Sequence, residues 1–453
     1  MAAAKMKTKI RNGQTLIRSA TVGDNACFIG CYAAVLDQAF KVNLMIDVDV
    51  LIVGGGLVGS TLAAALCGTG ISVALVDSTD LYDGINSEFD GRSFAVSLAS
   101  HRVLSGVGIG QHLGEDQSPI RDIRISDGPS LMFLHFDHRD AGGEPMGYMI
   151  ENHSLRRAQY KRLIKAKDLI LRSPDSVVCL GRNAYGVTAE LASGARLKAK
   201  LLVGADGRGS RVRSDAGIAL TKWEYNQAGI VCAVKHDYHH NNIAHERFLP
   251  SGPFAILPLK GNPPEAGNRS SLVWTEVNEL IPNIINLNDQ EFIGEISQRF
   301  GDFLGNVELA GPRYTFPLAL QFAKNSIDRR LVLIGDAACA MHPIAGQGFN
   351  MGLRDVASLA EVLVDTVKLG LDIGEDQVLQ KYIRWRRFDT NLMLAATDGL
   401  NRLFSNNVAP ARLARDLGLA AVNRCPPLKR FFVRHAMGLV GNLPRLLRGD
   451  SLV

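Results

Sequence analysis

The clearest pattern in the chain is a short apolar run, a glycine-rich turn and a second apolar run. Residues 48–53 are rich in β-branched side chains, which is typical of a buried parallel strand. The alanine-rich residues 60–66 predict a helix after the turn, and Gly68 and Gly70 would end it. Residues 71–76 then predict a strand that leads to Asp77. This stretch therefore predicts a βαβ unit of about 30 residues.

Further along, the pattern changes twice. Two apolar runs, 201–203 and 331–334, predict buried strands that lead into turns containing Gly and Asp. Between them, strands separated by Pro and Gly are predicted at 229–234, 254–259 and 271–277, which is typical of an antiparallel sheet. After Asn350 the apolar spacing is helical and remains mostly so to the C-terminus.

These patterns predict an α/β fold. We expect a doubly wound, discontinuous Rossmann-like domain, an inserted antiparallel substrate domain and a helical C-terminal tail. The expected dinucleotide domain comprises residues 45–120, 149–228 and 319–395, and the substrate domain comprises 121–148 and 229–318. Residues 396–453 form the tail, and residues 1–44 form an extension that is either disordered or a targeting segment.

Composition narrows the class. The chain has 453 residues, 46% of them hydrophobic and 21% charged, which indicates a globular protein with two to three domains. Its 7 cysteines are scattered and lack metal-ligand spacing, so we expect a reducing compartment, no structural disulfide and no metal. No apolar run approaches the roughly 20 residues that a membrane-spanning helix needs.

Charge is concentrated at the two ends. The formal net charge is +5, but residues 1–23 carry five Lys or Arg and no acid. Residues 402–448 carry nine Lys or Arg and a single acid, Asp416. This distribution favours contact with an anionic surface, and we find no nucleic-acid-binding motif.

The first turn has the spacing of a dinucleotide-binding fingerprint. Gly54 permits the tight turn, Gly56 lets the backbone approach a pyrophosphate, and Gly59 lets helix and strand pack closely. The helix start offers N–H groups to phosphates, and Asp77 is placed to accept from ribose hydroxyls. Three glycines alone are a weak signal in a chain with 45 of them, and an ordinary βα turn is the alternative.

Two further segments have strand, acid and glycine in succession. Residues 204–213 place Asp206 and Gly207 in a turn before a basic stretch, although a polar turn capping a helix at Ser210 would look the same. Residues 335–355 begin with Gly335 and Asp336 at a strand end, where a carboxylate can bond a polyhydroxyl chain. Small residues later in this segment would let backbone amides approach a planar ring.

Taken in order, these three segments resemble the class A flavoprotein monooxygenases. The run from His342 to Asn350 resembles the UbiH-like ubiquinone-biosynthesis hydroxylases of that family, and the resemblance extends from Met45 to the C-terminus. It implies a bound FAD, with NADPH or NADH as the reductant or an electron-transfer protein in its place. The residues that it assigns to the cofactor are Gly54, Gly56, Leu57, Val58, Gly59, Asp77, Arg92, Asp206, Gly207, Gly335, Asp336, Gly346, Gln347, Gly348, Phe349 and Asn350.

The same resemblance implies a mechanism. A flavin C4a-hydroperoxide would transfer one oxygen of O₂ to an electron-rich phenol, with His342 and Pro343 beside the reacting ring and water excluded. The sequence shows no obvious dedicated base, and Cys339 stands where the family often has His. Candidate walls of the substrate pocket, each of which could instead be core, are Phe254, Leu257, Pro258, Trp274, Phe316, Pro317, Pro343 and Ile344.

The basic tail fits a membrane-bound substrate. Its Lys and Arg residues alternate with Leu and Phe, as in a helix that lies on an anionic bilayer, although a solvated face or a docking surface for partner proteins would look similar. We therefore expect a hydroxylase of polyprenylated phenols, cytoplasmic and peripheral on the inner membrane, or on the matrix face of the mitochondrial inner membrane. The alternatives are a monooxygenase of a soluble aromatic compound and a non-catalytic, FAD-bearing subunit of a ubiquinone-biosynthesis complex.

Overall fold

The computed structural model describes residues 10–11, 14–15, 45–83, 90–128, 133–261, 266–341, 347–404 and 422–453. For residues 10–11, 14–15, 388, 391–398 and 400–404 only the backbone is described. The chain divides into two units, Met1–Met45 and Ile46–Val453. In the first unit, β1 (Ile10–Arg11) pairs antiparallel with β2 (Gln14–Thr15). Apart from Met45, which begins β3, the elements below belong to the second unit.

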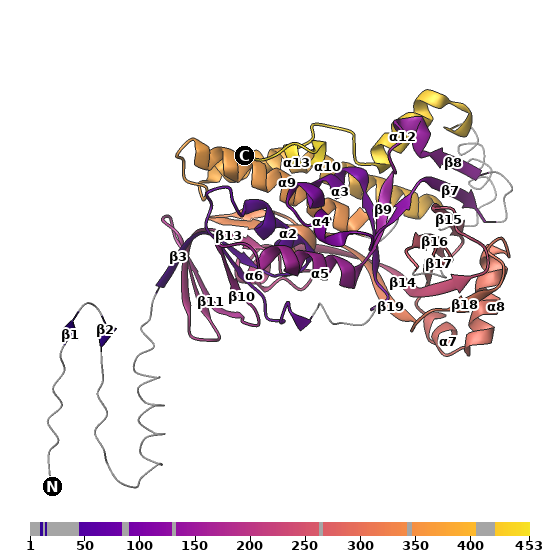
Figure 1. Cartoon of the computed structure of the whole chain (residues 1–453), viewed down its shortest axis with the longest axis horizontal. Helices are drawn as coiled ribbons and strands as arrows, with labels where there is room; N and C mark the ends of the chain where they lie inside the picture. The colour runs from indigo at the N-terminus through magenta and orange to yellow at the C-terminus, as the bar shows by residue number, and fades with distance from the viewer. Residues whose placement is uncertain are drawn as a thin grey trace, which may run out of the picture. The chain divides into compact units, whose positions relative to one another are not determined.

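An eight-stranded sheet forms one end of the second unit, on the left in Figure 1. Its main strands run in the order β10 (Leu169–Arg172), β4 (Val73–Val76), β3 (Met45–Val53), β13 (Arg196–Gly204), β12 (Val187–Leu191) and β11 (Val177–Arg182). β21 (Leu331–Leu333) pairs with β13 in parallel and with β20 (Ile327–Asp328) antiparallel. The four strands predicted for this domain are thus confirmed, and their apolar runs are buried because helices cover the sheet.

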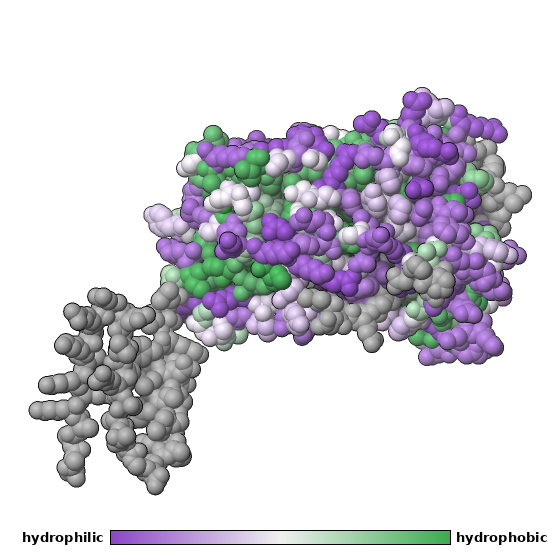
Figure 2. All heavy atoms as spheres, viewed as in Figure 1, coloured by the Kyte–Doolittle hydropathy of each residue, from purple (hydrophilic) through white to green (hydrophobic). Residues whose placement is uncertain are grey.

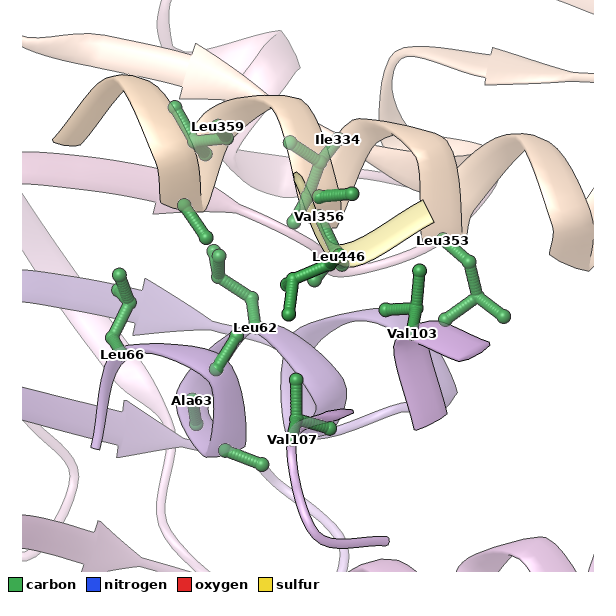
Figure 3. Close-up of a cluster of buried hydrophobic side chains, with 14 of the residues drawn as sticks. Leu62, Ala63, Leu66, Val103, Val107, Ile334, Leu353, Val356, Leu359 and Leu446 are labelled. Carbon is green, nitrogen blue, oxygen red and sulfur yellow. The ribbon is translucent and has the colours of Figure 1, made fainter. Parts of the chain in front are cut away.

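Helices from distant parts of the chain pack on this sheet. They are α2 (Leu57–Leu66), α3 (Leu98–Gly106), α4 (Gly110–Leu113), α5 (Asn152–Leu163), α6 (Arg211–Asp215), α9 (Gln347–Lys368), α10 (Asp376–Phe404) and α13 (Arg445–Arg448). Figure 3 shows Leu62 and Leu66 of α2 pointing toward Val356 and Leu359 of α9, with Leu446 of α13 beside them. This shared core joins residues from both ends of the second unit.

A nine-stranded sheet forms the other end. Its order is β22 (Cys339–Ala340), β19 (Tyr314–Ala323), β14 (Leu220–His236), β17 (Arg269–Val277), β16 (Gly252–Leu259), β15 (Ile243–Leu249), β7 (Asp122–Asp127) and β8 (Phe133–Asp137), with β18 (Val307–Leu309) paired to β14. The pairs are antiparallel except β15 with β7. The three predicted strands are confirmed, but β14 begins nine residues before the predicted Gly229.

One face of this sheet is covered by α7 (Ile281–Ile285) and α8 (Asp289–Phe300). The start of α8 is defined by a capping box, in which Asn288 and Glu291 satisfy each other's backbone N–H groups. Phe292 of α8 packs against the buried Trp274. This face therefore has its own hydrophobic core.

A third sheet, which the sequence analysis did not predict, connects the two larger ones. It consists of β5 (Ser93–Ser97), β9 (Gly147–Glu151) and β6 (Ser118–Ile120). Nearby lie η2 (His138–Ala141) and α12 (Pro426–Ala436), and η3 (Gly335–Ala337) follows β21. On the face seen in Figure 2, polar residues predominate and apolar areas lie between them, as expected for a folded unit with a buried core.

Candidate active site

The turn between β3 and α2 contains glycines that the packing requires. Gly54 has a φ of +108°, and a Cβ there would lie 2.3 Å from the carbonyl oxygen of Ala205. A Cβ at Gly59 would lie 1.9 Å from the carbonyl oxygen of Gly54. At Gly56, in contrast, a Cβ would meet nothing within 4 Å. Gly54 and Gly59 are therefore needed by the protein itself, whereas Gly56 borders open space in which a ligand can approach the backbone.

The start of α2 leaves N–H groups available for an anion. Gly56 is the N-cap, so no side chain bonds these groups, and the first turn has no acidic residue. Leu57 and Val58 occupy this turn, and their predicted contact with the cofactor stays a prediction. Val58 also packs closely against α9, since a Cβ at Gly352 would lie 2.5 Å from Val58 Cγ2. The geometry provides a positive helix end beside the open space at Gly56.

Asp77 lies directly after β4, and backbone N–H groups fix the direction of its carboxylate. Its Oδ2 accepts from the N–H of Gly55 at 2.5 Å, and its Oδ1 accepts from the N–H of Thr79 at 2.7 Å. A cavity of about 490 Å³ opens here, lined by Gly54, Gly56, Asp77, Val178, Asp206, Gly207 and neighbouring residues. The first two predicted cofactor segments thus meet at one cavity, although more than a hundred residues separate them in sequence.

Asp206 has one satisfied and one unsatisfied oxygen. Its Oδ2 accepts from the N–H of Val212 at 3.1 Å, which caps the start of α6. Its Oδ1 is buried and has no hydrogen-bond partner within the described part of the chain. A buried carboxylate oxygen without a donor is costly, so a ligand hydroxyl is the expected partner. Asp206 therefore caps α6, and its role in binding the cofactor stays a prediction.

Arginines connect the second and third segments. Arg213 is buried and donates to the carbonyl oxygens of Ala337, at 2.8 Å, and Arg208, at 2.9 Å. Arg208 in turn contacts Asp336 at 3.3 Å. Neither arginine was assigned a role from the sequence, because a basic stretch after a turn resembles a solvated surface.

Asp336 follows Gly335, which adopts a φ of +58° at the end of β21. Surrounding protein raises the pKa of Asp336 above its ordinary value, and Arg208 partly opposes that shift. Its side chain nevertheless keeps 43% of its accessible area, so the carboxylate lies in a crowded position that remains open on one side. Such a position suits hydrogen bonding to a ligand hydroxyl.

A buried ionic network supports this segment from behind. Asp355 of α9 accepts from the N–H of Gly335 at 3.0 Å and from Arg386 Nε at 2.7 Å. Arg386 also contacts Asp389, which accepts from Arg354 at 2.5 Å. The network joins α9 and α10 to the turn that carries Asp336. Arg386 was missed in the sequence analysis, because an arginine in a basic helical run is normally exposed.

The start of α9 contains the predicted cofactor residues Gln347, Gly348, Phe349 and Asn350. Asn350 is buried; its Oδ1 accepts from the N–H of Ser97 at 2.9 Å and its Nδ2 donates to the carbonyl oxygen of Ala95 at 2.8 Å. Phe349 packs on Phe94 with ring centroids 5.3 Å apart. These contacts attach the start of α9 to β5. The predicted site residues His342, Pro343, Ile344 and Gly346 lie outside the described residues.

Arg92 lies directly before β5, near the start of α9. Its guanidinium pairs with Asp90 at 2.5 Å, and Asn152 donates to the same carboxylate at 2.6 Å. The nearby Gly91 has a φ of +78°, and a Cβ there would lie 2.1 Å from the Tyr314 ring. The predicted role of Arg92 in binding the cofactor remains a prediction, and Asp90 fixes the direction of its side chain.

The predicted substrate-pocket residues separate onto two faces of the nine-stranded sheet. Phe254 and Trp274 are fully buried in the core beneath α8, so the structure supports the core alternative for this pair and corrects the expectation that they line a pocket. Pro258 shares their face because strand residues alternate. Leu257 points to the other face, where it packs near Ala95. Phe316 is partly buried there and Pro317 is exposed.

Cys339 lies in β22, near Met341 and Met351. Burial raises the pKa of its thiol to about 12, and the nearby carboxylates of Asp355 and Asp336 add to the shift. A thiol with such a pKa stays protonated at neutral pH and is a poor nucleophile.

Together these features fit a dinucleotide that carries hydroxyl groups. An uncapped helix start faces open space at Gly56, Asp77 lies beside it, and Asp206 has an oxygen without a donor. The fold and the site define an α/β nucleotide-binding protein.

Comparison with known proteins identifies the ligand. Residues 47–388 match the model of a family described as "FAD binding domain", and the chain belongs to this family. The ubiquinone hydroxylase UbiL of Rhodospirillum rubrum is 48% identical over 442 residues, which cover 97% of this chain and 100% of that protein. The 3-demethoxyubiquinol 3-hydroxylase of Escherichia coli is 34% identical over 395 residues, 86% of this chain and 98% of that protein.

Solved structures agree on the fold. The p-nitrophenol 4-monooxygenase PnpA of Pseudomonas putida has a TM-score of 0.71 at 19% identity and covers 88% of this chain and all of its own. PqsL of Pseudomonas aeruginosa, a probable FAD-dependent monooxygenase, has a TM-score of 0.69 at 18% identity over 82% of this chain. The protein is therefore a UbiH-like class A flavoprotein: an FAD-dependent, hydroxylating monooxygenase.

Proposed function

We propose that the protein inserts one oxygen atom of O₂ into the aromatic ring of a polyprenylated phenol on the route to ubiquinone. The observation that carries the proposal is the match to ubiquinone hydroxylases along almost the whole chain, rather than along the FAD-binding part alone. The nine-stranded sheet, on which we expect the substrate, lies within the matched length, as do the residues that face β5. A polyprenylated ring is the substrate class common to these relatives' names.

Some of the described residues would bind FAD, and others would keep water from the reacting ring. Bound FAD would accept electrons from NADPH or NADH and activate O₂. The start of α2 would hold the pyrophosphate, and Asp77, Asp206 and Asp336 would accept from cofactor hydroxyls. The apolar side chains between the nine-stranded sheet and β5 would keep water from the reacting ring.

The direct test uses the purified protein with FAD, NADPH or NADH, O₂ and a short-chain prenyl phenol in detergent. We expect a product one oxygen atom heavier, detected by mass spectrometry, and reductant oxidation that the phenol stimulates. The Gly56→Ala variant is the matched control, because the added methyl group occupies space that only a ligand uses. No product from a range of prenyl phenols would contradict the proposal.

A test in cells separates the alternatives. A strain that lacks the protein is expected to accumulate an under-hydroxylated prenyl phenol in organic extracts. An unchanged prenyl phenol pool would favour a soluble aromatic substrate instead. Full restoration of ubiquinone by an Asp336→Ala variant that binds no FAD would favour a non-catalytic subunit of a complex.

We also propose that α12 attaches the protein to an anionic membrane. Its exposed apolar residues are Leu428 (40%), Phe431 (51%) and Phe432 (41%). They lie beside the exposed Arg430 and Arg434, so one segment offers apolar groups for the acyl boundary and cations for lipid headgroups, whereas Lys429 pairs with Asp140 at 2.9 Å. None of the described helices is both long and apolar enough to cross a bilayer. The cytoplasmic and the mitochondrial matrix faces of an inner membrane both fit this proposal.

Vesicle flotation tests the attachment. The protein is expected to float with phosphatidylglycerol-containing vesicles and much less with neutral ones. Changing Phe431 and Phe432 to Ser should abolish most of this binding, because it removes buried apolar area at the bilayer. Changing Tyr185 and Leu369, which are 89% and 69% exposed elsewhere, to Ser is the matched control. Equal flotation of both double variants would contradict the role of α12.

A further inference from the structure

Glu246 of β15 lies in one row with residues from four other strands of the nine-stranded sheet. It pairs with Ala255 of β16, which pairs with Val273 of β17. Val273 pairs with Val231 of β14, which pairs with Tyr314 of β19. Directly paired strand residues point to the same face, so Glu246 and Tyr314 share a face of the sheet.

This face is the one turned toward the FAD-binding part of the protein. Tyr314 packs against the backbone of Gly91, next to Arg92. In the neighbouring row, Ser93 Oγ of β5 donates to Ser271 Oγ of β17 at 2.9 Å. β5 is also the strand to which Asn350, at the start of α9, is bonded. The face that carries Glu246 thus adjoins elements of the predicted flavin site.

The residues on either side of Glu246 point the other way. His245 packs against Phe300 of α8 with ring centroids 5.6 Å apart. Arg247 donates to the carbonyl oxygen of Arg299 at 2.6 Å, also in α8. The charged run from His245 to Arg247 does not show, in sequence, which of its side chains is buried. The strand pairing places the side chain of Glu246 on one face of the sheet and those of His245 and Arg247 on the other.

Glu246 has apolar neighbours on its own face. Beside it, β16 contributes Ala255, β7 contributes Ile125, and Leu257 lies one row further on. β5, β9 and α12 add Ala95, Met149 and Val433 to the hydrophobic cluster over this face.

Few charged groups share this face of the sheet. By strand alternation and pairing they are Asp127 of β7, which is buried, Lys235 of β14, Glu308 of β18, which lies opposite Lys235, and Arg269 of β17, which contacts Glu151 at 2.8 Å. None of them shifts the pKa of Glu246.

The carboxylate therefore has no compensating partner in the described part of the chain. Among the residues that the structure describes, no group donates a hydrogen bond or an ion pair to it, and burial alone raises its pKa to about 7. Its side chain keeps part of its accessible area, as expected for a group at the wall of a binding site. A carboxyl group left unpaired and partly accessible in apolar surroundings is a candidate for contact with a ligand.

We propose that the Glu246 carboxylate accepts a hydrogen bond from the phenolic hydroxyl of the substrate and takes its proton during oxygen transfer. This inference rests on the proposed function and names a catalytic base for it. A ring carbon ortho or para to the hydroxyl gives an electron pair to the incoming oxygen, whose bond to its partner oxygen breaks and leaves its pair on that partner. The phenolic O–H pair forms a ring carbonyl and the proton passes to Glu246.

The ring then regains aromaticity. The hydroxylated carbon loses its hydrogen as a proton, which the oxygen left with the electron pair takes up. The carbonyl oxygen recovers a proton from Glu246, and the product has two hydroxyls where the substrate had one. Glu246 ends as the carboxylate, so it serves repeatedly. A base with a pKa near the working pH is the most effective kind, since it is both ionised and able to hold the proton.

The test compares Glu246→Gln, Glu246→Asp and Glu276→Gln with the wild type, all loaded with FAD. Glu276 lies on β17 with its side chain bonded to Trp274 on the opposite face, so its substitution is a matched control. With a short-chain prenyl phenol, we expect Glu246→Gln to lower hydroxylation by about 10²-fold or more, which is the lower end of general-base effects. Reductant oxidation should continue and release H₂O₂. Glu246→Asp should recover part of the loss.

A second readout is binding without turnover. Under anaerobic conditions, with oxidised flavin, the affinity of the wild type for the same phenol should increase as the pH rises through 7, because the ionised carboxylate is the better acceptor. Glu246→Gln should lose this dependence and Glu276→Gln should keep it. FAD content and circular dichroism establish that each variant is folded.

The outcomes distinguish the two proposals. If the wild type forms product and Glu246→Gln forms as much, with the same pH dependence of binding, then the role of Glu246 is wrong and the proposed function stands. If the wild type forms no product from any prenyl phenol, the proposed function fails and the inference about Glu246 fails with it. A loss of hydroxylation restored in part by Asp, with pH-independent binding in Gln, supports the inference.

Discussion

Replacing Glu246 with Gln should stabilise the protein at alkaline pH. The folded protein raises the pKa of this carboxyl from an ordinary 4.5 to about 7, because burial disfavours the ionised form. The native state thus binds the proton more tightly than the unfolded chain does. The free energy of unfolding is therefore highest below pH 4.5, falls as the pH rises toward 7, and is constant above it.

The size of the effect follows from the shift. A difference of 2.5 pKa units at about 1.4 kcal/mol per unit gives about 3 kcal/mol as an upper limit, since the carboxylate keeps some contact with solvent. Gln cannot ionise, so the variant should avoid this loss. We expect Glu246→Gln to be more stable than the wild type by up to about 3 kcal/mol at pH 8. Near pH 4.5 the two should be nearly equal.

The measurement is urea-induced unfolding followed by far-ultraviolet circular dichroism at pH 5 and pH 8, with FAD absent or saturating in both proteins. Glu224→Gln is the control, because Glu224 is exposed beside Lys222 and its substitution should change stability little at either pH. A difference between wild type and Glu246→Gln that is the same at pH 5 and pH 8 would refute the reasoning. Greater stability with lower activity is the usual sign of an unpaired active-site group.

Other substitutions test the cofactor site and its support. Gly56→Ala should leave the melting temperature of the FAD-free protein unchanged but weaken FAD binding about tenfold or more, as measured by fluorescence titration. Gly59→Ala should prevent folding, because its Cβ would lie 1.9 Å from a carbonyl oxygen. Equal FAD affinity of Gly56→Ala and wild type would be contrary evidence. Gly352→Ala should lower the free energy of unfolding by about 1–3 kcal/mol, measured with a denaturant. Adding Val58→Ala should restore part of this free energy. No recovery would mean that the contact between α2 and α9 is not the cause of the loss. Arg386→Met removes the ion-pair partner of the buried Asp355 carboxylate and should lower the free energy of unfolding by about 3–5 kcal/mol. A calorimetric scan can check this value, and an unchanged stability would contradict it.

Local sequence was sufficient for the first dinucleotide-binding segment. The strand at 48–53, the helix after Gly59 and the strand leading to Asp77 depend on neighbouring residues, and the structure has them as β3, α2 and β4. Glycine spacing and the apolar runs carry that information because turn geometry and strand burial are short-range properties. The strands predicted at 254–259 and 271–277 were found for the same reason.

The same pattern did not show to which face of the sheet each side chain points. Both faces of the nine-stranded sheet are apolar, one beneath α8 and one toward β5, so alternation alone does not tell which face meets a ligand. Phe254 and Trp274 were expected in the pocket and lie in the core beneath α8 instead. The sheet of β5, β9 and β6 also escaped prediction, because its strands pair across distant parts of the chain.

By itself, the sequence determined the class of this protein: a FAD-binding α/β fold, its glycine turn and the acids that follow three strands, since each depends on residues close together in the chain. Only the tertiary structure decided which distant groups meet. It placed Asp206 and Asp77 at the same cavity, buried Arg386 against Asp355, and set Glu246 on an apolar face while its neighbours His245 and Arg247 point to the other face. Burial and the loss of hydrogen-bond partners are properties of the packed chain, and they give these side chains their chemistry.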